Sequence, residues 1–262
     1  MSKQIVIEHL GQSAIVTIDN PPANVWTLDS LQQLALAMDA LDADEQVRAV
    51  VITGAGDKFF SAGADLQQFA RGDRQMAGQV ADAFALAFNS IRQFRGVTVA
   101  AVNGFALGGG LECALACDYI VAERGARLGL PETSVGQLPC AGGTKTLADR
   151  VGLPWAKRII LGGETVTAEQ ALHIGLVEEV VDPGLAKIMA VSMAGKVARQ
   201  GRLAVLAARQ LIEGSQQMPL DRQLLQEKAA FLALMGGTEQ QEGVGAFLAK
   251  RKPAWVDEDE DN

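Results

Sequence analysis

Apolar and polar residues alternate near the start of the chain and then follow a helical repeat. Residues 4–8 and 14–18 alternate in a way that predicts two strands of a hairpin, with a glycine between them. Between positions 31 and 41, leucine and methionine recur every three or four residues, which predicts one face of a helix. Ser30 and Gln33 match the pattern of a capping box at its start.

Three continuous apolar runs follow, at 49–53, 97–102 and 119–122. Runs of this length without alternation are typical of strands buried on both faces. Helical repeats separate them at 80–91 and 111–117. A β-α-β-α-β order predicts parallel strands joined by crossover helices, so we expect an α/β fold.

Beyond position 183 the pattern contains only helical repeats. They cover 185–200, 203–213, 220–235 and 239–250, with glycines at the breaks between them. We therefore expect a β/α core at 1–194 and a helical region at 195–262.

Composition and charge narrow the functional classes. The 262 residues are 48% hydrophobic and 21% charged, which is ordinary for a globular protein. The net charge is -8, and five of the acids form an acidic tail, Asp257–Asp261. Without that tail the chain carries 23 basic and 26 acidic residues, so its charge gives no reason to expect a nucleic-acid partner.

The three cysteines, Cys113, Cys117 and Cys140, point to reduced thiols. We expect no signal peptide and no membrane span, since the longest uncharged run, 96–111, is short and rich in glycine. These features together predict a cytoplasmic protein. Cys113 and Cys117 have helical spacing, but no nearby histidine or further cysteine would complete a metal site.

Two glycine-rich loops start like nucleotide-binding motifs and then depart from them. The loops at 54–59 and 108–113 carry Phe59 and Cys113 where a dinucleotide fingerprint has its third glycine. No segment matches a phosphate-binding P-loop. We therefore expect neither redox chemistry with a nucleotide cofactor nor phosphoryl transfer.

Glycine-rich loops of this kind can instead bind the carbonyl oxygen of an acyl group through their backbone N–H groups. If Ala64 and Gly109 point their backbone N–H groups at one carbonyl oxygen, they form an oxyanion hole, and the start of a helix at Gly109 adds a favourable dipole. The alternative is that the glycines only permit tight turns and close packing. Spacing alone leaves both interpretations open.

Two carboxylates, Glu112 and Glu132, follow these loops in apolar, glycine-rich surroundings. Each is also explained by the preference for an acid at a helix N-terminus. The two histidines, His9 and His173, are interpreted as structural, and Ser61 does not lie in a nucleophile elbow.

Four ordered segments carry a family resemblance. They are Phe60-Ser-Ala-Gly-Ala-Asp-Leu66, Asn103–Glu112, Pro131-Glu132 with the later Gly142-Gly143-Thr144, and Leu161–Val177. Together they resemble the enoyl-CoA hydratase/isomerase (crotonase) family, from the first strands to about residue 252. The resemblance implies a crotonase-like spiral core of repeated ββα turns and a helical C-terminal trimerisation region, with trimers that can pair into hexamers.

The resemblance also implies roles for residues. Ala64 and Gly109 match the oxyanion N–H donors, and Glu112 and Glu132 match the two acid/base glutamates. The positions that border substrate or coenzyme A (CoA) are Val25, Ala62, Ala64, Asp65, Leu66, Gln67, Gly109, Phe247 and Lys250. The segment Phe247–Lys250 is similar to one that reaches CoA from a neighbouring subunit.

Two positions depart from the family pattern. Cys140 stands where a glycine is common, and Trp26 is bulkier than the usual residue. The stretch 67–83 is expected to line part of the acyl pocket.

The implied activity is syn addition of water to a 2-enoyl-CoA, giving a 3-hydroxyacyl-CoA. It needs no metal or redox cofactor, because CoA is part of the substrate. The alternatives are an enoyl-CoA isomerase or another acyl-CoA enzyme of the family and, from a different class, a non-catalytic scaffold that binds acyl-CoA or RNA.

Overall fold

The computed structural model describes residues 3–216 and 218–256, and the acidic tail lies outside them. The chain divides into two compact units, Met1–Ala194 and Gly195–Asn262.

The larger sheet of the first unit has the order β1-β2-β3-β5-β7-β10. The strands β1 and β2 form the expected antiparallel hairpin, and the remaining neighbours pair in parallel. The strands are β1 (Ile5–Leu10), β2 (Ser13–Ile18), β3 (Ala49–Gly54), β5 (Val97–Val102), β7 (Tyr119–Glu123) and β10 (Glu179–Val181). The parallel order predicted from the buried apolar runs is confirmed.

A second, smaller sheet has the order β4-β6-β8-β9, in which β4, β6 and β8 are parallel. Its strands are β4 (Phe59–Ser61), β6 (Phe105–Leu107), β8 (Arg127–Gly129) and β9 (Thr165–Thr167). Each of the first three follows a strand of the larger sheet along the chain and precedes a helix. This repeat is the expected spiral of ββα turns. The short strands themselves were not predicted, because three residues are too few to show a period.

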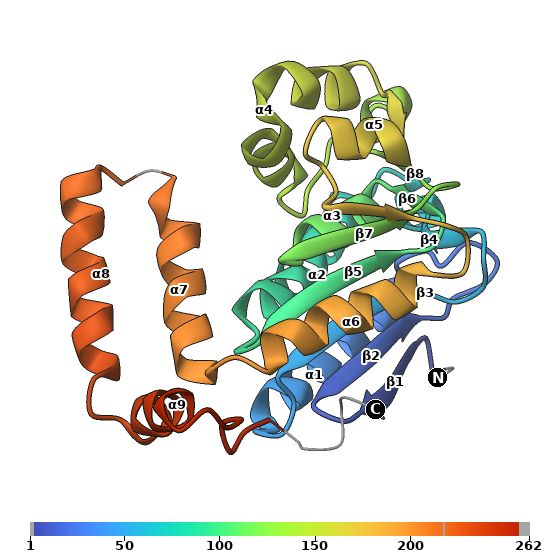
Figure 1. The fold of residues 1–262 in the computed structure, drawn as a ribbon. Coiled ribbons are helices and arrows are strands. Elements are labelled where there is room, and N and C mark those ends of the chain that lie inside the picture. Colours follow the sequence, from blue (N-terminus) through green and yellow to red (C-terminus); the bar gives the residue numbers. More distant parts are fainter. Residues whose placement is uncertain (1–2, 217, 257–262) are drawn as a thin grey trace. The chain divides into compact units, whose positions relative to one another are not determined.

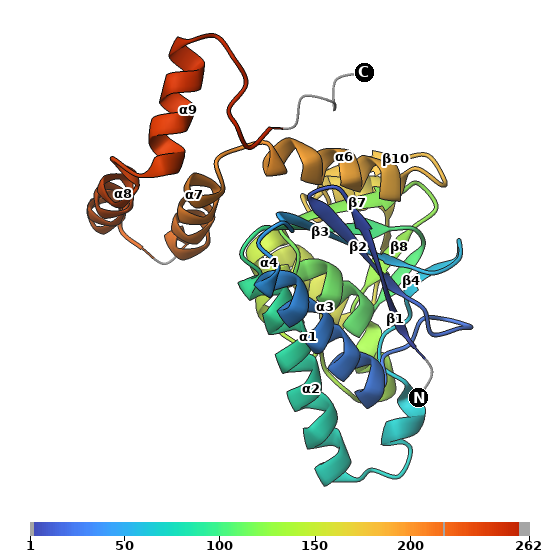
Figure 2. The ribbon, with the colours of Figure 1, turned by 90° about the horizontal axis from the view of Figure 1, so that it is seen from below.

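Helices cover both faces of the larger sheet (Figures 1 and 2). The helices α1 (Leu28–Ala43) and α2 (Arg74–Gln93) lie on one face, and α6 (Ala186–Ala198) lies on the other. In β3, Val50 and Ile52 belong to the main hydrophobic core. The alternation of side chains along a strand then turns the buried Val51 to the opposite face.

The start of α1 differs from the prediction. Its N-cap is Thr27, which forms a capping box with Ser30. The side chain of Gln33 instead accepts hydrogen bonds from the backbone N–H groups of Gln4 at 2.9 Å and of Ile5, the first residue of β1, at 3.3 Å. The predicted Ser30–Gln33 box is therefore wrong, because Gln33 ties the helix to the first strand rather than capping it.

The remaining helices of the first unit follow the short strands or connect them. They are η1 (Leu66–Phe69), α3 (Gly109–Leu115), η2 (Pro131–Val135), α4 (Gly143–Leu161) and α5 (Ala168–His173), where η marks a 3₁₀-helix. Among the described residues, no helix is both long and apolar enough to cross a bilayer.

The second unit contains α7 (Arg202–Ser215), α8 (Leu220–Leu234) and α9 (Thr238–Leu248). The carboxylate of Glu239 accepts a hydrogen bond from the backbone N–H of Leu203 at 2.9 Å, so α9 supplies the N-terminal cap of α7. The indole N–H of Trp255 donates to the carbonyl of Arg199 at 3.2 Å. These hydrogen bonds connect segments of the second unit that are far apart in sequence.

Candidate active site

The smaller sheet brings the candidate residues together. The loop with Ala64 follows β4, the loop with Gly109 follows β6, and the segment with Glu132 follows β8. Because these three strands are parallel neighbours, their carboxyl ends meet at one edge of the sheet. Residues far apart in sequence therefore converge.

Backbone pairing fixes the first loop. The N–H of Trp26 donates to the carbonyl of Gly63 at 2.8 Å, and the N–H of Asp65 donates to the carbonyl of Trp26 at 3.0 Å. Gly63 has φ +89°, and a Cβ there would lie 2.7 Å from the carbonyl oxygen of Leu107. Glycine is required at this close approach. Within the described residues, this pairing leaves the N–H of Ala64 without a partner.

The second loop turns sharply into α3. Gly108 has φ +53°, and a Cβ there would lie 3.0 Å from Oε1 of Glu132. The next residue, Gly109, is the first residue of α3, so its N–H has no acceptor within the helix. The described residues supply no other acceptor for it. Two unpaired N–H groups and the positive end of a helix dipole suit an oxygen that gains negative charge.

Glu112 lies in the first turn of α3 and is only 2% exposed. Its Oε1 accepts hydrogen bonds from the backbone N–H groups of Ala141 and Gly143, both at 2.8 Å. Burial raises the pKa of Glu112, while these two hydrogen bonds and the charge of Arg92 act in the opposite direction. The two hydrogen bonds thus fix the carboxyl group in position. Together with Arg92 they offset part of the rise in its pKa that burial causes.

Glu132 lies in η2, just after Pro131 at the start of that helix. The hydroxyl of Thr133 donates to the carbonyl of Ile160 at 2.8 Å and anchors η2 to α4. Among the described residues, Oε2 of Glu132 is buried without a hydrogen-bond partner. Burial first, and the charge of Glu112 second, raise the pKa of Glu132 to about 7. The two carboxyl groups therefore differ: Oε1 of Glu112 accepts two backbone hydrogen bonds, which favour its charged form, whereas Glu132 readily holds a proton.

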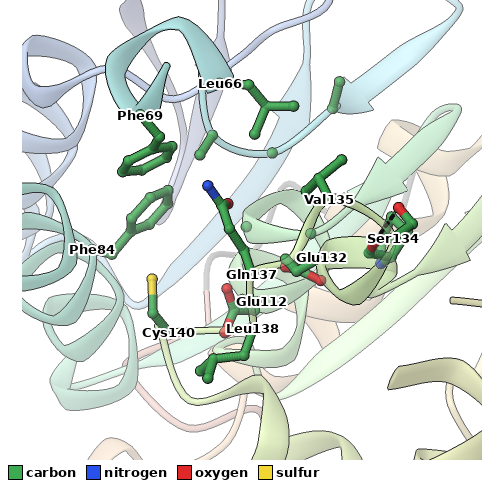
Figure 3. Close-up of a pocket in the computed structure, with 16 residues that line it drawn as sticks. Leu66, Phe69, Phe84, Glu112, Glu132, Ser134, Val135, Gln137, Leu138 and Cys140 are labelled. Atoms are coloured by element: carbon green, nitrogen blue, oxygen red, sulfur yellow. Dashed lines mark hydrogen bonds between the residues drawn. The ribbon is translucent and has the colours of Figure 1, made fainter. Parts of the chain in front are cut away.

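Both carboxyl groups line a cavity of about 150 Å³ (Figure 3). Six of the residues predicted from the sequence are among its lining residues: Ala62, Ala64, Leu66, Gly109, Glu112 and Glu132. The lining residues Phe84, Ser134, Val135, Gln137 and Leu138 were not predicted. In the sequence, Phe84 is recognisable only as part of the apolar face of α2. The other four lie just after Glu132, in a segment without a recognisable pattern. Phe69 lines the cavity from the stretch 67–83, where part of the acyl pocket was expected.

Three of the residues predicted to contact CoA, namely Val25, Asp65 and Gln67, are not among the lining residues. The carboxylate of Asp65 accepts a hydrogen bond from the N–H of Gln67 at 3.0 Å and caps η1. Phe247 and Lys250 belong to the second unit. CoA binding by these five residues stays a prediction.

The bulky Trp26 and two of the cysteines, Cys113 and Cys117, are buried, whereas Cys140 is exposed to the cavity. Trp26 is fully buried, and its ring packs edge-on against Phe88. Its backbone, which is hydrogen-bonded to Gly63 and Asp65, is thereby fixed and positions the first loop. All three cysteines are free thiols. Cys140 lines the cavity, where burial and the charges of the two glutamates raise its pKa to about 11, so its thiol is protonated at neutral pH. Within the described ranges, no cluster of three or more His, Cys, Asp and Glu residues could hold a metal ion.

Comparisons with known proteins agree with this geometry. A family profile described as enoyl-CoA hydratase/isomerase matches residues 11–258. The chain is 38% identical to the 2,3-dehydroadipyl-CoA hydratase of Escherichia coli K12, over 95% of this chain and 97% of that protein. It is 35% identical to the short-chain-enoyl-CoA hydratase of Clostridium acetobutylicum, over 95% of both chains.

Solved structures show the same fold. The structure of Pseudomonas aeruginosa DspI matches with a TM-score of 0.94 and 49% identity, over 97% of both chains. The crystal structure of enoyl-CoA hydratase from Bacillus anthracis matches with a TM-score of 0.92 and 33% identity, over 96% of this chain and 98% of that one. The chain belongs to the enoyl-CoA hydratase/isomerase family, and its fold is the crotonase fold.

Proposed function

We propose that this protein is an enoyl-CoA hydratase, a hydro-lyase that adds water across the α,β double bond of a 2-enoyl-CoA to give a 3-hydroxyacyl-CoA. The names of the relatives support this activity. The observation that carries the proposal is the pairing of Glu112, anchored by two backbone N–H groups, with a proton-holding Glu132 in one cavity.

The unpaired N–H groups of Ala64 and Gly109 bind the thioester oxygen. As water adds at the β-carbon, electron density moves from the double bond to this oxygen and forms an enolate. Donors fixed in advance stabilise that charge without reorganising, and loss of one such donor costs about 10²–10³ in rate.

Glu112 and Glu132 jointly orient the water and divide the proton transfers. The anionic Glu112 accepts a proton from the water while its oxygen bonds to the β-carbon. The protonated Glu132 then donates its proton to the α-carbon, and the enolate collapses to the thioester. The proton on Glu112 returns to Glu132 before the next turnover, so the sum of the steps is the addition of one water.

The rest of the proposal concerns binding and assembly. The substrate is an acyl-CoA thioester, with CoA bordered by the first loop and by Phe247 and Lys250 of a neighbouring subunit. The protein is a homo-oligomer, either a trimer or a dimer of trimers. It needs no metal or redox cofactor and acts in the cytoplasm.

The proposal is tested by mixing the protein with crotonyl-CoA and following ultraviolet absorbance. Hydration removes the conjugated double bond, so the absorbance falls and the product mass increases by one water. An isomerase acting on a 3-enoyl-CoA would instead increase the absorbance. A scaffold would bind acyl-CoA and leave the absorbance unchanged.

A further inference from the structure

The segment 141–143, which donates two hydrogen bonds to Glu112, is also contacted by Arg92. Ala141 donates its N–H to Oε1 of Glu112 at 2.8 Å. The carbonyl of the same Ala141 accepts a hydrogen bond from Nη2 of Arg92 at 3.2 Å. A chain of two hydrogen bonds through one residue therefore connects the Arg92 guanidinium to the Glu112 carboxylate.

The guanidinium also lies against the turn that follows. Gly142 has φ +105°, and a Cβ there would lie 3.0 Å from Nη2 of Arg92. Gly143, the next residue, donates the second hydrogen bond to Oε1 of Glu112 at 2.8 Å. Arg92 thus contacts the turn that carries both N–H donors.

Arg92 is a fixed cation behind the cavity. It lies in the last turn of α2, is half-buried and is not among the residues that line the cavity. The attraction between Arg92 and Glu112 favours the charged form of each: it raises the pKa of Arg92 and lowers the pKa of Glu112, against the larger effect of burial on both.

Other titratable groups close to Glu112 act in the opposite sense. Glu132 from η2 and Cys140 from the segment before α4 both interact electrostatically with Glu112. Both become negative when they ionise, so neither favours the anion of Glu112. Arg92 is the cation in this set.

We propose that Arg92 is a positioning residue for hydration: it holds the segment 140–143 and keeps Glu112 as the oriented anion that accepts a proton from water. Its part in hydration rests on the proposed function, whereas its control of Glu112 does not. Arg92 has no contact with substrate in this proposal and acts only through Glu112.

The test compares Arg92→Met, which removes the charge and the donors, with Arg92→Lys, which restores the charge. Arg95→Met is the matched control. Arg95 follows the same helix end, but its Nε pairs with Oδ2 of Asp42 at 3.0 Å on the surface. Melting temperature and circular dichroism establish that each variant is folded.

The first readout is the ionisation of Glu112, measured by infrared titration of protein with isotope-labelled glutamate and assigned by comparison with Glu112→Gln. We expect Arg92→Met to raise the pKa of Glu112, because it removes the positive charge that favours the carboxylate. Arg92→Lys should recover most of that shift, and Arg95→Met should leave the pKa unchanged.

The second readout is hydration of crotonyl-CoA against pH. In Arg92→Met the acid limb of kcat/KM should move to higher pH by the same amount, and kcat on that limb should fall about tenfold, with KM within about twofold. A merely structural role for Arg92 would lower the melting temperature and leave the pH profile of the folded fraction in place.

A folded Arg92→Met with the wild-type pKa of Glu112 would overturn the proposal, whatever its rate. If Arg92→Met does not fold, Arg92→Gln decides in its place, because it removes the charge and keeps an N–H donor for the carbonyl of Ala141. If the wild type hydrates no 2-enoyl-CoA, the proposed function fails, and the infrared titration still decides whether Arg92 controls Glu112.

Discussion

The two units of this chain use their apolar residues in different ways. In the first unit, strands β3 and β5 are buried along their whole length. In the second unit, many large apolar side chains are exposed: Leu203, Ile212, Leu220, Leu224, Leu225, Phe231, Leu232, Phe247 and Leu248 are each between 53% and 81% exposed. The first unit encloses a large buried core, whereas these side chains of the second unit are not buried within that unit.

This difference suggests that the first unit serves chemistry and the second serves assembly. A rigid, closed core is what a site needs when it must hold N–H donors and carboxylates in place before reaction. Exposed apolar side chains gathered in one unit favour contact with another protein. Changes in the first unit should therefore abolish chemistry without altering assembly, and changes in the second should do the reverse.

The largest effect is expected at Glu132. Glu132→Gln keeps the side-chain volume but supplies no exchangeable acid proton, so kcat for crotonyl-CoA hydration should fall about 10³-fold. Binding of a saturated acyl-CoA and the oligomeric mass should be unchanged. Glu227→Gln, at an exposed acid of the second unit, is the control and should keep full activity. Near-normal turnover by Glu132→Gln would remove this residue from the mechanism.

The next effect separates the N–H of Gly109 from the space around it. A Cβ at this position would lie 2.9 Å from Cε1 of Phe84, so any substitution disturbs the packing. Gly109→Ala and Gly109→Pro both add that atom, but only proline removes the N–H. We expect a further loss in kcat of about 10²–10³-fold for proline relative to alanine, with affinity for butyryl-CoA retained in both. Equal kcat in two folded variants would contradict the oxyanion role.

The parts of this molecule that the sequence predicts are those with a long enough pattern. Buried strands such as 97–102 and amphipathic helices such as 80–91 show clear periods, and their type and order are confirmed. The candidate residues Ala64, Gly109, Glu112 and Glu132 were proposed from glycine-rich motifs and a family resemblance, and they share one cavity.

What the sequence did not predict depends on contacts between distant segments. The strands β4, β6 and β8, whose ends place the loops, are three residues each and pair only with one another or with β9. The hydrogen bond from the N–H of Ala141 to the carboxylate of Glu112 joins positions 29 residues apart. The hydrogen bond of Gln33 to the first strand and the burial of Trp26 also depend on tertiary packing.

A smaller effect on catalysis is expected from the second unit. Light scattering should give the wild type a mass that is a multiple of 27.6 kDa, and Leu225→Glu should lower it, because a charge on the exposed apolar face disfavours its burial between subunits. Hydration kcat should stay within about threefold. A wild-type mass near that of one chain at micromolar concentration would contradict the oligomer.

The smallest effect concerns stability and pH. The pKa of Glu132 is about 7 in the folded protein, against an ordinary value of 4.5. Because the folded state favours the protonated form, this group's contribution to stability is present below pH 4.5 and is lost as the pH rises to about 7. Glu132→Gln has no group to ionise, so it does not lose this stability. In urea unfolding at constant protein concentration, its free energy of unfolding at pH 8 should exceed that of the wild type by about 1–2 kcal/mol. This value is reduced because the carboxylate is partly exposed to solvent. The difference should vanish at pH 4, and a gap that is the same at both pH values would contradict the assigned pKa.

The most direct test of the account is hydration of crotonyl-CoA in D₂O, with the product analysed by NMR. If Glu132 donates to the α-carbon while Glu112 activates water in the same cavity, the product is 3-hydroxybutyryl-CoA with one deuterium at the α-carbon, on the same face as the new hydroxyl. Addition to opposite faces would contradict the paired-glutamate mechanism. Deuterium at the γ-carbon without a hydroxyl would assign the site to isomerisation instead.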